Sequence, residues 1–100
     1  MAAQQEERVE WTDFETITVS GSSQSLTAAK ANIADTVLLT LDGASARYRM
    51  DGTAPTATVG HLMASGDVAV LHGYWEITGF RIIQVSAGSS LTVSFGKRRS

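Results

Sequence analysis

Short segments of β-forming residues, separated by glycine-containing turns, set the strongest limit on how this chain can fold. In residues 15–20, Ile17 and Val19 lie on one face and Thr16 and Thr18 on the other, which is typical of a half-buried strand. Similar segments recur at intervals of roughly 8–12 residues, the spacing expected of a β-sandwich or small barrel. We therefore predict an all-β fold: a single small antiparallel sandwich or barrel, jelly-roll-like, with roughly seven to eight short strands.

The expected strands are rich in β-branched and aromatic residues and end at Gly, Asp-Gly or Ser turns. They cover residues 15–20, 36–41, 45–50, 68–71, 74–77, 80–85 and 91–95. Segment 26–35 carries four alanines, and a short helix, a single turn or an irregular connection all fit it. Pro55 belongs to a turn or an edge, because proline has no N–H to donate to a central strand pair.

The predicted core takes the inward-facing residues of these segments. It comprises Ile17, Val19, Val37, Leu39, Leu41, Tyr48, Val68, Val70, Ile77, Phe80, Ile82, Leu91, Val93 and Phe95.

Charge is distributed unevenly along the 100 residues, whose overall net charge is −2. The first fifteen residues hold five carboxylates and one arginine, a local net of −4, whereas Lys97, Arg98 and Arg99 give the end a local +3. We expect a flexible acidic N-terminal arm at residues 1–10, a β-sandwich domain at 11–96 and a basic C-terminal tail at 97–100. The opposite charges of the two ends suit contacts between copies of the chain. The alternative is that both ends are exposed to solvent and make no such contact.

Composition excludes several classes of protein. The chain has no cysteine, so disulfides and cysteine zinc sites are ruled out. We expect no membrane partner, because no apolar run is long enough to span a bilayer, and no nucleic-acid partner, because the net charge is negative. The N-terminus does not read as a signal peptide, which favours a protein made and used in a cytosol or in particles assembled there.

Residues suited to catalysis are sparse. His61 and His72 each adjoin a glycine and have no serine nucleophile motif near them. The Asp-Gly pairs lack the acidic ligand spacing of a calcium loop. We therefore expect no enzyme activity, no metal and no cofactor.

Residues suited to protein contacts are better represented. Arg47 and Arg49 alternate with Tyr48, which places both arginines on the opposite face, as part of either a solvated surface or an interface. Trp75 follows Tyr74, and strand alternation would turn one of these two rings outward. The candidate interface residues are Trp11, Phe14, Arg47, Arg49, Asp51, Trp75, Lys97, Arg98 and Arg99.

The stretches ARYRMDGTAPTATVGHLMASGDVAVLHG and ITGFRIIQVSAGSSLTVSFGK carry a resemblance over about residues 35–97. This order of an Arg-x-x-x-Asp-Gly strand end, a Pro-Thr turn, a glycine-rich link and a final strand pair resembles small structural proteins of tailed-phage virions. The resemblance implies a capsid cement (decoration) protein, located in a virion that is assembled in the host cytoplasm. Its implied partners are the major capsid protein or other virion proteins and its own copies, as a trimer or dimer.

Three alternatives stay open. The resemblance also covers a neck, tail or fibre component. A glycan-binding β-module of a receptor-binding appendage would use Trp75, Tyr74 and His72 as a stacking platform. A cupin-type β-barrel enzyme is the third alternative, and it would need a metal.

Overall fold

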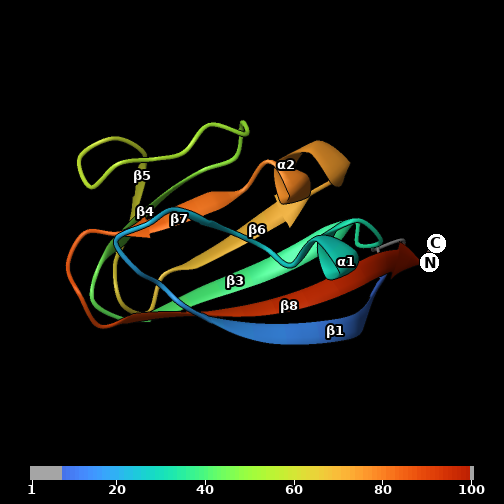
Figure 1. Ribbon diagram of the computed structural model, residues 1–100. Helices are drawn as coiled ribbons and strands as arrows, with labels where there is room; N and C mark the ends of the chain where they lie inside the picture. Colours follow the sequence, from blue (N-terminus) through green and yellow to red (C-terminus); the bar gives the residue numbers. More distant parts are fainter. Residues whose placement is uncertain (1–7, 100) are drawn as a thin grey trace.

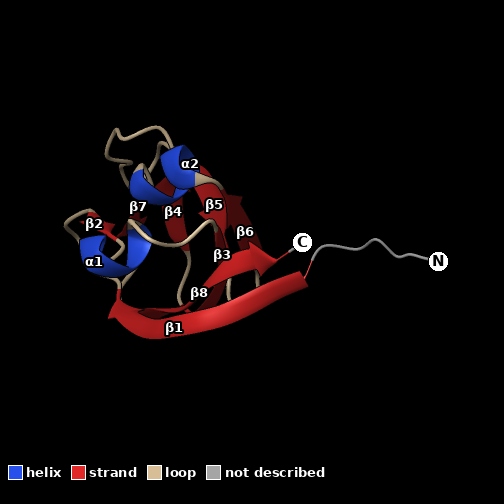
Figure 2. Cartoon of the chain, turned by 90° about the vertical axis from the view of Figure 1, so that its right-hand side faces the viewer, coloured by secondary structure: helices blue, strands red, loops and turns tan. Residues whose placement is uncertain are grey.

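The computed structural model describes residues 8–99, with side chains from Val9 to Arg98 (Figure 1). The strands in this range are β1 (Arg8–Thr18), β2 (Gln24–Ser25), β3 (Thr36–Gly43), β4 (Ala46–Arg49), β5 (His61–Met63), β6 (Val68–His72), β7 (Arg81–Gln84) and β8 (Ser89–Arg99). Two short helices, α1 (Ala28–Ala31) and α2 (Tyr74–Thr78), lie in connections between strands. The strands form two four-stranded sheets, in the orders β1-β8-β3-β6 and β2-β7-β4-β5, which face each other in Figure 2.

Strand pairing is symmetric about the middle of the chain, with the first strand paired to the last and the pairs continuing inward. β1 pairs with β8, β2 with β7, β3 with β6 and β4 with β5, all antiparallel. These pairs form one long ribbon, which further pairing of β3 with β8 and of β4 with β7 folds into two sheets. A rolled ribbon of this kind is a jelly roll. The predicted antiparallel, jelly-roll-like sandwich is confirmed, whereas the barrel alternative is wrong because each sheet ends in two edge strands.

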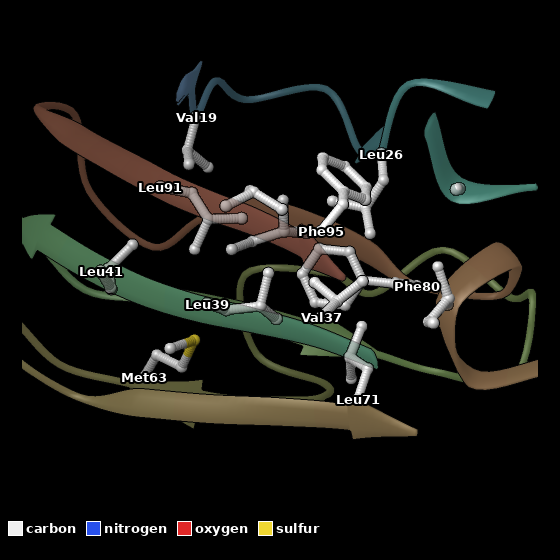
Figure 3. Packing of buried hydrophobic residues seen from close by; sticks show 14 of the residues in the cluster. Val19, Leu26, Val37, Leu39, Leu41, Met63, Leu71, Phe80, Leu91 and Phe95 are labelled. Carbon is white, nitrogen blue, oxygen red and sulfur yellow. The ribbon is translucent and has the colours of Figure 1, made fainter. Parts of the chain in front are cut away.

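The core lies between the two sheets. Figure 3 shows Val37, Leu39 and Leu41 of β3 pointing into the same interior as Leu91 and Phe95 of β8. The predicted core residues that are buried are Val19, Val37, Leu39, Leu41, Ile77, Phe80, Ile82, Leu91, Val93 and Phe95. Ile17 and Tyr48 are partly buried against this cluster, and the core also takes in Leu26, Ala31, Ala34, Ala46, Met63 and Leu71.

Two predicted core residues, Val68 and Val70, are exposed instead. The register of β3 with β6 places Leu71 opposite the buried Val37. Because side chains alternate between faces, Val68 and Val70 then point away from the interior, and 60% and 45% of their surface is exposed. The segment VAVL is apolar on both faces, so its alternation alone did not identify the buried one.

The predicted strand at residues 74–77 is wrong, because this segment forms helix α2. Gly73 turns the chain out of β6 at a φ of 85°, a region that L side chains rarely adopt. The Gly79 N–H then donates to the Trp75 carbonyl at 3.0 Å and closes the helix. Ile77 is buried as predicted, since one face of the helix packs on the core.

The segment 26–35 contains a single helical turn, α1, which is fixed to β1 by side chains. The backbone N–H of Thr27, at the start of α1, donates to Glu15 Oε2 at 3.0 Å, and the Thr27 hydroxyl donates to Glu15 Oε1. Lys30 Nζ donates to the Phe14 carbonyl at 2.9 Å and lies 3.5 Å from Asp13 Oδ1.

The sandwich extends beyond its predicted bounds at both ends of the chain. β1 already begins at Arg8 and β8 continues to Arg99, with Glu10 opposite Lys97 and Val9 opposite Arg98. Parts of the predicted acidic arm and basic tail therefore pair with each other within one chain. The rest of the predicted arm, residues 1–7, and residue 100 of the predicted tail lie outside the described residues.

Candidate interaction surfaces

The outer face of the β1-β8-β3-β6 sheet carries rows of uncharged side chains. One row crosses all four strands as Phe14, Ser94, Leu38 and Val70, according to the register of each pair. The next row is Thr16, Thr92, Thr40 and Val68. These two rows contain no charged residue, so a partner could cover them without desolvating an ion.

Trp11 extends this face at one end. It lies opposite Gly96, which in turn lies opposite Thr36 of β3. A Cβ on Gly96 would be 2.7 Å from Val9 Cγ1 and 2.8 Å from Trp11 Cε3, so the missing side chain makes room for both. We call Trp11, Phe14, Leu38, Val68 and Val70 the apolar sheet face.

The side chains of the apolar sheet face are highly exposed for apolar residues. Trp11, Phe14, Val68 and Val70 leave 48%, 57%, 60% and 45% of their surface accessible, and Leu38 is half-buried. Exposed apolar side chains that gather on one uncharged face often mark a binding site. Sequence reasoning selected Trp11 and Phe14 but missed Leu38, Val68 and Val70, because only the strand register brings them together.

The predicted candidates Lys97 and Arg98 lie at the Trp11 end of this sheet, in β8, where both are exposed. The Arg98 backbone N–H donates to Asp35 Oδ1 at 2.8 Å, which ties this end of β8 to the start of β3. Arg99 is paired in β8 through its backbone, and its side chain lies outside the described residues.

Arg47 lies on the outer face of the other sheet and holds a loop. Its Nε donates to the Ala57 carbonyl and its Nη1 to the Gly60 carbonyl, both at 3.0 Å. Pro55, in the same loop, is buried, and a Cβ on Gly60 would be 3.2 Å from Pro55 Cβ. The guanidinium of Arg47 is thus used within the chain, to fix the segment between β4 and β5.

Arg49 and Asp51 form an ion pair at the end of β4. Arg49 Nε lies 3.1 Å from Asp51 Oδ1, and Arg49 Nη2 lies 2.5 Å from Asp51 Oδ2. The hydrogen bond from Arg49, followed by that from the Thr53 N–H, lowers the pKa of Asp51, and the same pairing raises the pKa of Arg49. Arg47 and Arg49 share a face, as predicted, but each has its partner in the same chain.

Trp75 is the most exposed large hydrophobic residue of the described chain, at 81%. Its ring meets that of Tyr74 edge-on, with centroids 5.0 Å apart and an angle of 84°. Because α2 is a helix, both rings are exposed, and the expectation that strand alternation turns only one outward is wrong. The predicted platform of Trp75, Tyr74 and His72 is not a flat surface, since Tyr74 is perpendicular to Trp75 and His72 lies opposite Thr36 in β6.

The two histidines lie apart from each other in this arrangement. The His61 ring packs on Tyr48 with centroids 5.3 Å apart, whereas His72 ends β6 in the other sheet. Between residues 8 and 99, the structure holds no cluster of three or more His, Cys, Asp or Glu side chains that could bind a metal.

Comparisons with known proteins gave no match for this chain among protein-family models, curated proteins or solved structures. Neither helix of the described range is long and apolar enough to cross a membrane.

Proposed function

We propose that this protein is a non-enzymatic structural protein that stabilises a phage capsid as a cement (decoration) protein. The apolar sheet face carries the proposal, because it presents a broad area that is favourable to bury and inexpensive to desolvate. The capsid is proposed as the partner on the basis of the sequence resemblance over about residues 35–97 and of the jelly-roll sandwich that the chain forms.

The composition of the apolar sheet face suits a protein interface. Trp11 and Phe14 are large and rigid, and aromatic residues contribute most to binding at the centre of interfaces. The serine and threonine hydroxyls of β8 can donate or accept hydrogen bonds without carrying a charge. Burying each of the five apolar side chains would contribute about 1–2 kcal/mol before the cost of association is subtracted.

Charged residues border this face rather than interrupt it. Lys97 and Arg98 of β8 lie next to Gly96, the strand partner of Trp11, at one end of this face, whereas Asp13 lies opposite the buried Phe95 and pairs with Lys30 of α1, away from this face. An uncharged centre bordered by charged residues is common in specific interfaces, in which the rim selects orientation.

Attachment to particles tests the proposal. Virions produced by the genome that encodes the chain should contain it, and purified protein should bind virions that lack it. Val70→Lys should reduce this binding by about tenfold or more, because it places an ammonium among the apolar side chains of this face, beside Leu38. The control is Ile33→Lys, which changes an apolar residue outside this face that is 59% exposed, compared with 45% for Val70.

Three outcomes count against the proposal. Mass spectrometry of virions could detect none of the chain, or Val70→Lys could bind as well as the unmodified protein. A copy number far below that of the capsid protein would instead favour a neck, tail or fibre position.

A further inference from the structure

A groove lies between α2 and the loop that follows β4, which occupy the same side of the molecule in Figures 1 and 2. It consists of two adjoining hollows of about 660 and 350 Å³, both lined by Met50 and Asp51. The larger hollow reaches His61 and Glu76, and the smaller one reaches Trp75. None of these residues belongs to the apolar sheet face.

Hydrogen bonds hold both walls of the groove in place. The Gly52 N–H donates to the Gly79 carbonyl at 3.0 Å, which joins the Asp51-Gly52 turn to the end of α2. The other wall is held by the two hydrogen bonds of Arg47 to its loop. A groove fixed in this way needs little ordering when a ligand enters, which favours affinity.

The lining combines an exposed aromatic ring with planar polar groups. Trp75 offers its ring to solvent, and the Arg49–Asp51 ion pair lies beside it along the groove. Glu76 Oε1 accepts the His72 N–H at 2.8 Å, and Glu76 Oε2 has no partner within residues 8–99. Carboxylates and guanidinium groups that lie in a plane can pair with two adjacent hydroxyls at once.

These properties select a class of ligand. A sugar ring has an apolar C–H face that can cover an indole and neighbouring hydroxyls that pair with carboxylates. Arg49 and Asp51 neutralise each other in their ion pair, and the remaining carboxylate of Glu76 disfavours an anionic ligand. Two linked hollows open to solvent suit a chain of residues better than one compact molecule.

We propose that this groove binds a neutral oligosaccharide, with one sugar ring stacked on Trp75 and hydroxyl groups hydrogen-bonded to Asp51 and Glu76. This function is separate from capsid docking and uses different residues. A decorated particle would thereby carry a sugar-binding site on its surface.

Tryptophan fluorescence gives a direct test, because Trp11 and Trp75 are the two tryptophans of the chain. In the Trp11→Phe variant, Trp75 is the one remaining tryptophan, so the emission reports on the groove. The probes are soluble oligosaccharides of glucose, galactose, mannose and N-acetylglucosamine, each titrated separately. At least one probe should change the emission in a saturable manner. The affinity of Trp75→Ala for the same probe should be lower by about tenfold or more, and Trp75→Tyr should retain part of the affinity. Calorimetry measures the affinity of both variants.

Arg81→Ala is the control. Arg81 of β7 lies opposite Arg49 of β4 but does not line the groove. It should bind the probe as the unmodified chain does. The proposal is overturned if none of the oligosaccharides binds, if Trp75→Ala binds as well as the unmodified protein, or if Trp75→Ala instead abolishes attachment to virions. The capsid proposal is judged separately, because Val70→Lys should leave sugar binding unchanged.

Discussion

Gly52 and Gly79 meet backbone to backbone, with the N–H of Gly52 donating to the Gly79 carbonyl at 3.0 Å. A Cβ on Gly79 would lie 2.7 Å from the Met50 carbonyl oxygen and 2.8 Å from the Trp75 carbonyl oxygen. Gly79 has a φ of −89°, which any residue adopts, so close approach rather than backbone conformation requires a glycine here. This contact connects β4 to α2 and sets the position of Trp75 relative to Asp51.

Gly79→Ala should therefore destabilise the protein by about 1–3 kcal/mol, since the added methyl group meets backbone atoms that cannot move alone. Chemical denaturation measures the change in the free energy of unfolding. Gly21→Ala is the control, because its Cβ would make only an ordinary contact, at 3.6 Å, with Gln84 Nε2. Equal stability of the two variants would contradict the close packing described here.

Leu39 and Val70 test the register of β3 with β6. Leu39 is fully buried, so Leu39→Ala should cost about 2–5 kcal/mol of unfolding free energy. Val70→Ala, on the exposed face, should change it by only about 0.5 kcal/mol. A large loss from Val70→Ala in the isolated protein would place this residue in the interior and rule out the apolar sheet face.

Arg47→Lys should loosen the loop between β4 and β5. A lysine ammonium lacks the fork geometry that lets Arg47 reach the carbonyls of Ala57 and Gly60 together, so about 1–3 kcal/mol should be lost. Amide hydrogen exchange should speed up at Val59, whose N–H donates to Thr56 within this loop. Arg81→Lys serves as the control, and equal exchange rates in the two variants would argue against the role of Arg47.

Asp51 should give the protein a small stability that disappears in acid. Its pKa in the folded chain lies below the ordinary value of 3.8, mainly because Arg49 donates to its carboxylate. The ionised form is therefore favoured by folding, and its contribution is present at neutral pH and lost as the pH falls from about 3.8 through the lowered pKa.

Thermal unfolding followed across this pH range measures the effect. Asp51→Asn should be slightly less stable than the unmodified chain at neutral pH, and the two curves should converge in acid. Asp42→Asn is the control, because this exposed carboxylate has no hydrogen-bond or ion-pair partner within residues 8–99. A difference that grows as the pH falls would contradict the assigned sign.

The sequence by itself determined that this chain forms a sandwich of short strands. Alternation of apolar and polar residues, as at Tyr48 between Arg47 and Arg49 in β4, is a local property that indicated most of the strand segments, and Gly43 and Gly88 mark turns at φ values of 90° and 104° that favour glycine. The sequence also indicated Trp11, Phe14 and Trp75 as exposed candidates for binding, because large rings outside the expected core are conspicuous in a small domain.

Only the tertiary structure decided which faces these residues share. VAVL in β6 is apolar at every position, so its pairing with β3, and not its pattern, turned Val68 and Val70 outward beside Leu38. Tyr74 to Ile77 is rich in the aromatic and β-branched residues that strands favour, yet the turn at Gly73 and the contact of Gly79 with the Asp51-Gly52 turn close it into a helix. In both cases the outcome depends on atoms distant in the chain, since strand register and backbone contact are properties of partners that a local pattern does not contain.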